Sequence, residues 1–313
     1  REDVVVTMSH EGYVKWQPLG DYSAQKRGGK GKTATRMKAQ DFVDKLFIAN
    51  THDMVLFFSS AGKVYWKKVY QMPQASRVAR GRPIINLLPL EEGERINAVL
   101  PIRDFNELAF VVLVTVGGFI KKTPLKDYSR PRATGIIALD LLGSDHLVGA
   151  QLTDGSKDIL LASSDGKIIR FNESHVRSMG RTARGVRGIR LNEEQSVISS
   201  MIAEDALVLV ATENGYGKCT SLNEFRAQGR GGQGVIAIQT SDRNGRVVGA
   251  LLVKPSDDVM LITDGGKLVR TRVEEISVQG RNTQGVRLIS LGECEKLVGL
   301  DRVMDDGEGL DER

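Results

Sequence analysis

A pattern that occurs six times along the chain constrains the fold more than any other feature of the sequence. In each copy an apolar run leads into a turn with glycine, and a second apolar and basic run follows, as in VVVTMSHEGYVKW and ILLASSDGKIIR. The turn glycines are Gly12, Gly62, Gly118, Gly166, Gly215 and Gly266, at spacings of 50, 56, 48, 49 and 51 residues. Glycine favours hairpin turns because it adopts a positive φ at little cost. The pattern therefore predicts six β-hairpins in a repeat protein.

A second, basic segment follows each hairpin at a nearly fixed distance. The six segments read QKRGGKG, SRVARGR, SRPRATG, MGRTARG, QGRGGQG and QGRNTQG. Each contains a late glycine, and these are Gly31, Gly81, Gly135, Gly185, Gly234 and Gly285. The late glycine follows the turn glycine by 19 residues in five copies and by 17 in the third. Because the turn glycine and the basic segment keep nearly the same separation in all six copies, we interpret the basic segments as equivalent loops of one repeated unit.

Two further apolar runs follow each loop, so each repeat holds about four strands, as propeller blades do. We predict one all-β domain of six blades over residues 1–303 and an acidic tail over 304–313. The last repeat ends on KLVGLDRV (296–303), and the first repeat has no evident counterpart. We therefore expect this final strand to complete the first blade and close the ring, which protects strand edges. A short helix is predicted near TRMKAQDFVDKL (35–46).

The charge distribution indicates a polyanionic partner. The 313 residues carry a net charge of +5, but the last thirteen hold six acids and two arginines, so the other 300 carry +9. A basic body favours binding to a polyanion. The acidic tail is interpreted either as a competitor for that partner or as a solvated terminus. The chain starts abruptly on a strand-like run, which we interpret as a fragment of a longer protein.

Residues with catalytic chemistry are sparse. His10, His52, His146 and His175 fall in different repeats without metal-ligand spacing, and the two cysteines form no framework. There is no Walker motif and no nucleophile elbow, so we assign no catalytic residue and no metal site. Trp16 and Trp66 take the same position in the first two repeats, which predicts packing between neighbouring blades. No run of 18 apolar residues is present, so we expect no membrane span.

The first basic segment carries a resemblance to a known family. QKRGGKG resembles Q-R-R-G-G-K-G, the signature box of the C-terminal domain of DNA gyrase A, and six of its seven positions match. The exception is Lys26, where lysine keeps the charge but loses the bidentate phosphate contact of arginine. The resemblance covers residues 1 to about 303. It implies a six-bladed β-pinwheel, a relative of the propeller in which neighbouring blades exchange strands.

The resemblance also implies a function. Domains of this family are non-catalytic modules that bend and chirally wrap duplex DNA around a basic rim, which enables ATP-dependent negative supercoiling by the holoenzyme. The fragment itself would need no cofactor, whereas ATP and magnesium serve the full complex, an isomerase. The implied partners are double-stranded DNA, gyrase B and the rest of gyrase A in an A2B2 assembly. The implied location is cytoplasmic and associated with the nucleoid, without membrane contact.

The candidate DNA-binding residues are the box and the cations that recur with the repeat. Lysine and arginine release counterions from phosphates, and glycine lets a backbone approach a phosphate closely. The box residues are Gln25, Lys26, Arg27, Gly28, Gly29, Lys30 and Gly31. The rim candidates are Lys15, Lys32, Arg36, Lys67, Lys68, Arg77, Arg80, Arg82, Lys121, Lys122, Arg130, Arg132, Arg170, Arg181, Arg184, Arg187, Lys218, Arg226, Arg230, Arg270, Arg281 and Arg287. On the second hairpin strands, alternation is expected to turn the cations toward water.

Three alternatives remain open on the sequence alone. The C-terminal domain of topoisomerase IV has similar blades but lacks an intact box. A protein-binding propeller fits the repeat, although the signature dipeptides of such propellers are missing and the predicted rim is basic. A propeller enzyme with a site in its central channel needs polar residues on the inner strands, which here are nearly all aliphatic.

Overall fold

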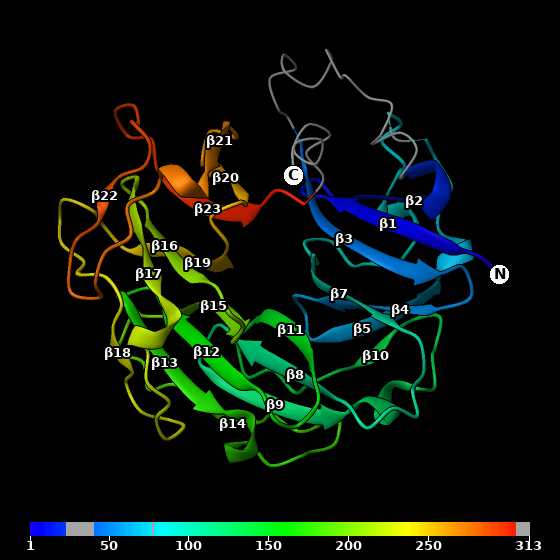
Figure 1. The fold of residues 1–313 in the computed structure, drawn as a ribbon. Coiled ribbons are helices and arrows are strands. Elements are labelled where there is room, and N and C mark those ends of the chain that lie inside the picture. Colours follow the sequence, from blue (N-terminus) through cyan, green and yellow to red (C-terminus); the bar gives the residue numbers. More distant parts are fainter. Residues whose placement is uncertain (23–40, 77, 305–313) are drawn as a thin grey trace.

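Six small antiparallel sheets follow one another around a common centre in the computed structural model of the chain (Figure 1). The structure describes residues 1–22, 41–76 and 78–304. Five sheets have four strands and the sixth has three among these residues. The prediction of an all-β fold with six blades and about four strands per blade is confirmed. The box, Lys32, Arg36, Arg77 and residues 305–313 lie outside the described residues.

Each sheet forms one blade, numbered in chain order, and the strands of a blade are named from the centre outward. Blade 1 holds β3 (Val43–Asn50), β1 (Asp3–Ser9), β2 (Tyr13–Pro18) and β6 (Arg82–Pro83). Blade 2 holds β7 (Ile96–Ile102), β4 (Met54–Ser59), β5 (Lys63–Lys68) and β10 (Ile136–Ile137). Blade 3 holds β11 (Leu147–Thr153), β8 (Phe110–Thr115), β9 (Phe119–Pro124) and β14 (Val186–Arg187).

The other three blades follow the same plan. Blade 4 holds β15 (Val197–Ile202), β12 (Asp158–Ser163), β13 (Lys167–Asn172) and β18 (Val235–Ile236). Blade 5 holds β19 (Val247–Val253), β16 (Leu207–Thr212), β17 (Tyr216–Ser221) and β22 (Val286–Arg287). Blade 6 holds β23 (Leu297–Arg302), β20 (Asp258–Thr263) and β21 (Leu268–Arg272). Short 3₁₀ turns are η1 (Val69–Gln71), η2 (Ile84–Asn86), η3 (Leu125–Tyr128), η4 (Glu173–His175), η5 (Leu222–Glu224) and η6 (Val273–Glu275).

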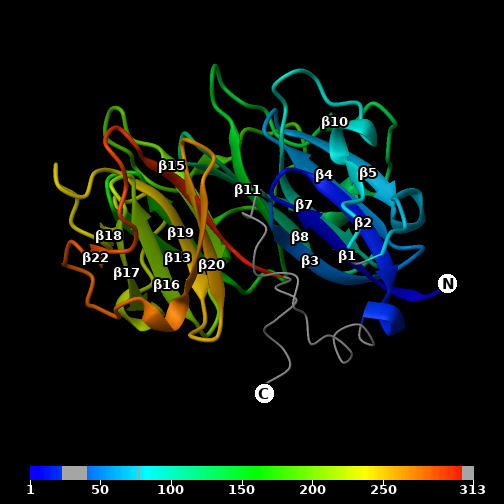
Figure 2. The same cartoon turned by 90° about the horizontal axis from the view of Figure 1, so that it is seen from above.

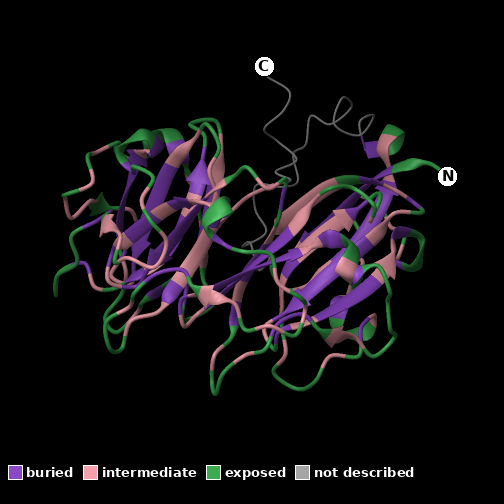
Figure 3. Cartoon of the chain, turned by 90° about the horizontal axis from the view of Figure 1, so that it is seen from below, coloured by how far each residue is buried: buried purple, intermediate pink, exposed green. Residues whose placement is uncertain are grey.

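The second and third strands from the centre of every blade form the predicted hairpin. All six turn glycines have a positive φ, from 73° at Gly62 to 90° at Gly118. A side chain is disfavoured in that region, which explains why glycine recurs there. Figure 3 shows buried residues along these strands and exposed residues at the turns and outer loops.

Neighbouring repeats exchange a strand, as the family resemblance implied. The outermost strand of blades 1–5 comes from the following repeat and starts one residue after the late glycine: β6, β10, β14, β18 and β22. At Gly285, for example, φ is 76° and a Cβ would lie 2.6 Å from the carbonyl oxygen of Gly217, so the exchange requires glycine there. The equivalent segment of the first repeat falls within residues 23–40, outside the described residues.

The predicted closure by the last strand is wrong. β23 pairs with β20 of its own blade, and β3 is the inner strand of blade 1, where it pairs with β1 from Asp3↔Asn50 to Ser9↔Val43. This pairing also replaces the helix expected near 35–46 over its described part from Val43 onward. Asp44 and Lys45 interrupt the apolar pattern, so the sequence did not indicate a strand here. Pairing with β1 outweighs the local helical pattern.

Five apolar clusters lie between consecutive blades. One joins Leu56 and Phe58 of blade 2 to Val111 and Leu113 of blade 3, and equivalent clusters occupy the 1–2, 3–4, 4–5 and 5–6 junctions. The two tryptophans belong to these clusters. Trp16 Nε1 donates to the carbonyl oxygen of Met72 at 2.9 Å, and Trp66 Nε1 donates to that of Tyr128 at 2.8 Å. The predicted role of the tryptophans between blades is confirmed.

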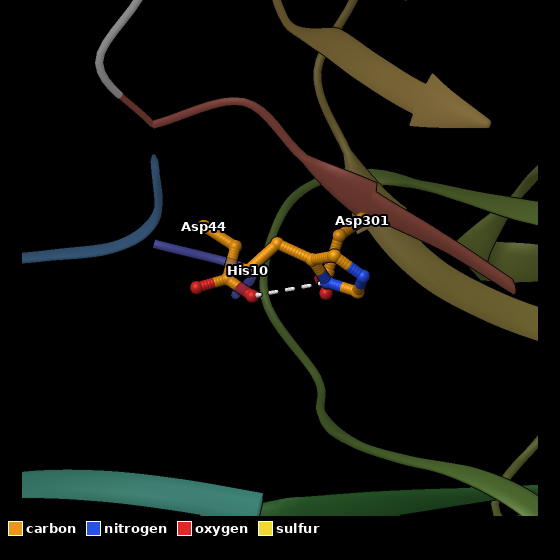
Figure 4. A group of neighbouring side chains, drawn as sticks. All are labelled: His10, Asp44 and Asp301. Atoms are coloured by element: carbon orange, nitrogen blue, oxygen red, sulfur yellow. Dashed lines mark ion pairs between the residues drawn. The ribbon is translucent and has the colours of Figure 1, made fainter. Parts of the chain in front are cut away.

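The junction of blade 6 with blade 1, which we call the seam, differs from the other five. None of the five apolar clusters of the described residues spans it. The Met304 N–H donates to the carbonyl oxygen of Val43 at 3.1 Å. Beside this bond, His10 and Asp44 of repeat 1 meet Asp301 of β23 (Figure 4). The seam is therefore polar where the other junctions are apolar.

Candidate nucleic-acid interface

A basic loop lies along the outer edge of each of blades 1–5. These rim loops are residues 74–83, 129–137, 178–187, 227–236 and 278–287, with residue 77 undescribed. In blades 1, 3, 4 and 5 the loop starts at a parallel bridge to the second hairpin strand, as in Lys122↔Ser178. Each loop ends in the exchanged strand. Figure 2 shows β18 and β22 at the periphery of the molecule, so the loops that end in these two strands lie on its outer edge.

Most of the described candidate cations reach the surface. The exposed ones are Arg80, Arg82, Arg130, Arg132, Arg184, Arg187, Arg226, Arg270 and Arg287. The half-buried ones are Lys67, Lys68, Arg170, Arg181, Arg230 and Arg281. Three of the fifteen bind an acidic partner at short range: Arg170 with Asp158, Arg184 with Asp140, and Arg270 with Asp258. The rim is thus basic over five blades, with part of its charge already neutralised within the protein.

Aromatic rings hold three of the rim arginines in place. The first residue after the turn glycine is aromatic in blades 1, 3 and 5, and an arginine of the rim loop stacks on it. The distances from guanidinium carbon to ring centroid are 4.4 Å for Arg80 on Tyr13, 4.7 Å for Arg187 on Phe119 and 5.7 Å for Arg287 on Tyr216. Such cation–π contacts orient the arginine at an exposed site.

Tyr216 contacts two arginines. Its hydroxyl accepts hydrogen bonds from Arg287 Nη2 at 3.2 Å and from Arg243 Nε at 3.4 Å. These bonds lower the pKa of Tyr216. Sequence reasoning missed this aromatic position. An alignment of the six second hairpin strands would have revealed it, because Lys63, Lys167 and Lys267 replace the aromatic residue in the even blades.

Four candidate lysines do not face water: Lys15, Lys121, Lys122 and Lys218 are all buried. The expectation that cations after the turn point to solvent is wrong for them. In a propeller both faces of a sheet pack against neighbouring blades, so alternation along a strand produces no wet face. Lys122 Nζ, for example, donates to the carbonyl oxygen of Glu173 at 3.0 Å and lies 4.9 Å from the Phe110 ring centroid.

The seam holds the one group of potential metal ligands found among the described residues. Donor atoms of His10, Asp44 and Asp301 lie within 4.8 Å of one another. Lys45 Nζ lies 3.3 Å from Asp44 Oδ1 and balances part of the charge. Nothing else among the described residues of the seam points to a metal ion, so we interpret the group as an interblade contact. No helix of the described ranges is long and apolar enough to cross a membrane.

The fold and the rim define a class, that of β-propeller modules with a basic outer edge. A family model described as the C-terminal domain of DNA gyrase, a β-propeller, matches residues 3–50, 53–103, 109–154, 157–204, 206–254 and 257–304. The chain belongs to this family. The six matched segments coincide with the six repeats, and the first one includes β3, in agreement with the corrected strand order.

Relatives found by sequence include gyrase A proteins. The chain is 56% identical over 314 residues to the DNA gyrase A protein of Salmonella typhimurium and 53% identical over 337 residues to that of Haemophilus influenzae. The matches cover 99% and 98% of this chain but only 36% and 38% of those proteins. The chain thus spans little more than a third of the curated relatives it matches.

Two solved structures share the fold over nearly the whole chain. The C-terminal domain of DNA topoisomerase IV matches with a TM-score of 0.86 and 29% identity, over 98% of this chain and 95% of that one. The C-terminal domain of DNA gyrase A matches with a TM-score of 0.70 and 25% identity, over 97% and 100%. The backbone alone therefore does not separate the two kinds of domain, whereas the sequence relatives and the family model name gyrase.

Proposed function

We propose that residues 1–303 form a non-catalytic DNA-wrapping domain of a DNA gyrase, with residues 304–313 as an acidic tail. The observation that carries the proposal is the recurrence of exposed or half-buried arginines on equivalent rim loops of consecutive blades. Contacts that repeat along a curved edge suit a bent duplex, because each one binds phosphate without reading sequence. Smooth bending costs about 1–6 kcal/mol per tight bend, and several rim contacts together offset that cost.

The proposed DNA-contacting set is narrower than the sequence suggested. It keeps the exposed and half-buried rim arginines, Lys67 and Lys68, and it leaves out the four buried lysines. The box, residues 25–31, stays in the set because its phase makes it the rim loop of the first repeat. Lys32, Arg36 and Arg77 stay as proposals of lower rank, since they too lie outside the described residues.

The role of the whole protein rests on the gyrase relatives. We propose that the domain works in an A2B2 complex with gyrase B, and that ATP and magnesium are used there and not by this domain. Wrapping of one hand would then set the direction of supercoiling. A cytoplasmic location on the bacterial chromosome follows from that role.

The test is a topology assay with the 313-residue chain. Nicked circular DNA is bound, ligated and stripped of protein, and the linking number is measured over a range of salt. We expect a linking change of one sign, and an affinity that falls about tenfold or more per doubling of salt, because several phosphates are neutralised. An unchanged linking number would show that the chain does not wrap DNA.

The box is tested by replacing Lys26, Arg27 and Lys30 with alanine. We expect most of the linking change to be lost while affinity falls by less than about tenfold, since five other rim loops remain. The matched control replaces Arg181, Arg184 and Arg187, which removes the same charge from one other loop. Equal effects of the two triple variants on the linking change would remove the special role of the box.

The topoisomerase IV type of domain is the second candidate, and the TM-score of 0.86 favours it. The same assay separates the two. Dependence of the linking change on the box supports the gyrase type, because the topoisomerase IV type resembles this chain in its blades but not in an intact box.

A further inference from the structure

Lysine alternates with uncharged residues at one position of the six blades. The third residue after the turn glycine is Lys15, Lys121 and Lys218 in blades 1, 3 and 5. The same position holds Tyr65, Ile169 and Val269 in blades 2, 4 and 6. The three lysines are 9%, 0% and 0% exposed. Lysine is almost never fully buried without partners, so we expect each of these three amino groups to have hydrogen-bond acceptors nearby.

Each of these lysines binds carbonyl oxygens of the rim loop on its own blade. Lys121 Nζ donates to Gly180 at 3.2 Å and to Arg181 at 2.5 Å, and also to Ala138. Lys218 Nζ donates to the equivalent Gly280 at 2.6 Å and Arg281 at 2.7 Å.

The third lysine makes contacts of the same kind. Lys15 Nζ donates to the carbonyl oxygens of Ser76 at 2.9 Å and Ala79 at 2.7 Å. An ammonium group has three donors and no acceptor, so a set of carbonyl oxygens matches its charged form. The loop backbone is thereby tied to the hairpin strand beneath it.

The arginines at the Lys121 and Lys218 contacts extend the contact along the rim. Arg181 Nη1 donates to the carbonyl oxygen of Ile137, in the exchanged strand of the preceding blade, at 3.2 Å. Arg281 Nη1 makes the equivalent bond to Ile236 at 3.0 Å. The lysine fixes the backbone of the arginine, and the arginine side chain fixes the loop to its neighbour.

We propose that Lys15, Lys121 and Lys218 are positioning residues that hold the rim loops of alternate blades in the form that binds DNA. The inference rests on the proposed function. The rim would then offer three loops held by a buried ammonium group, separated by loops without that support. These lysines touch no phosphate themselves, because their amino groups are enclosed by the loops.

Titration of the two most buried lysines gives the proposal a signature. Burial lowers the pKa of Lys121 to about 7, with Arg181 lowering it further and Asp127 opposing. Burial lowers the pKa of Lys218 to about 8, with Glu224 opposing and Arg281 lowering it further. When pH rises through this range the amine loses a proton and one donor. The loops lose part of their support, so DNA affinity should fall between about pH 7 and pH 9.

The test compares Lys121→Met and Lys218→Met, singly and together, with Lys167→Met and Lys267→Met in the same chain. The control substitutions make the same change of lysine to methionine, at the turns of blades 4 and 6. Binding of a linear duplex is measured at constant ionic strength from about pH 6.5 to pH 9. We expect the double variant to bind about tenfold more weakly at pH 7 and to show a flatter pH profile. The controls should keep the wild-type profile.

Three outcomes decide the matter. A folded double variant with wild-type affinity and profile overturns the inference. If the variants fail to fold, the wild-type profile still decides, since an affinity that does not fall from about pH 7 to pH 9 also overturns it. A wild-type chain that binds no duplex at all would instead remove the proposed function.

Discussion

The seam and the five other junctions join blades by different means. Each of the five is filled by an apolar cluster and spanned by an exchanged strand. The seam brings His10, Asp44 and Asp301 together, beside the bond from Met304 to Val43. In repeat proteins stability is approximately a sum over neighbouring units. The blades therefore form a row joined by apolar junctions, and the first and last blades meet through polar contacts. We expect the stability of this last junction to depend on pH.

The carboxyl groups at the seam make it sensitive to pH. Burial raises the pKa of Asp301 to about 7, and the nearby Asp44 raises it further while Lys45 opposes. Burial also raises the pKa of Asp44. A carboxyl whose pKa is raised binds protons more readily in the closed seam than in water. Its favourable contribution is therefore fully present below about pH 4 and is lost as pH rises to about 7.

The largest effect is expected at an apolar junction. Trp66→Ala removes an indole that is 8% exposed and leaves the Tyr128 carbonyl oxygen without its donor. The free energy of unfolding should fall by about 3–5 kcal/mol, measured by urea unfolding. Trp16→Ala, at the equivalent place in blade 1, should cost a similar amount. A loss below about 1 kcal/mol in both variants would contradict the view that these junctions dominate stability.

A smaller loss is expected at an exchanged strand. Gly285→Ala combines a φ of 76° with a Cβ only 2.6 Å from the Gly217 carbonyl oxygen. The strain should lower the free energy of unfolding by about 1–3 kcal/mol, measured in the same way. Gly280→Ala in the same loop is the matched control, because its φ is not positive and the nearest atom to its Cβ is Glu224 Oε1 at 3.6 Å. Equal effects of both substitutions would show that the exchange itself does not require glycine.

At the seam the expected effect is smaller and of opposite sign. Asp301→Asn removes the carboxylate that burial disfavours, so at pH 8 the melting temperature should rise by about 2 °C. The rise should vanish at about pH 4, where Asp301 is protonated in the wild type. Asp242→Asn, at an exposed turn of repeat 5, serves as the control. A variant less stable than wild type at the higher pH would mean that the carboxylate supports the seam.

The smallest effect concerns the tail that follows the seam. Deletion of residues 304–313 removes five of the six acids of the last thirteen residues. DNA affinity at low salt should therefore rise about two- to threefold. Deletion of 305–313 removes the same acids but keeps Met304 and its bond to Val43. If charge is the cause, the two deletions act equally. No change in either would leave the tail as a solvated terminus.

Much of the fold could be predicted because glycine marks its turns so regularly. The six hairpins, the phase of the loops and the interblade tryptophans all follow from local sequence chemistry. The inner strand of blade 1 could not be predicted, since Asp44 and Lys45 break its apolar pattern and only pairing with β1 defines it. The family resemblance, not the repeat alone, identified the box, and its residues lie outside the described structure.

The site was harder to predict from the residues alone. A lysine after a turn is usually a surface charge, yet Lys121 and Lys218 are buried because carbonyl oxygens from a distant loop enclose their amino groups. Which face of a strand is wet depends on the neighbouring blades, and the local sequence does not specify them. The alternation of lysine with uncharged residues between odd and even blades was visible in the sequence. Only the contacts of the lysine amino groups with the rim loops indicate a role for it.

Strand exchange has a consequence for how such a chain can grow or shrink. A sequence repeat and a structural blade do not have the same boundaries. Every repeat from the second to the last contributes one strand, the outermost, to the preceding blade. An inserted copy would supply the edge of the preceding blade and receive its own edge from the following copy, so a duplication within the array takes the edge strand from no blade. Removal of the last repeat would instead leave blade 5 without β22. Loss of the last repeat therefore removes an edge strand from the blade before it, whereas an inserted repeat removes none.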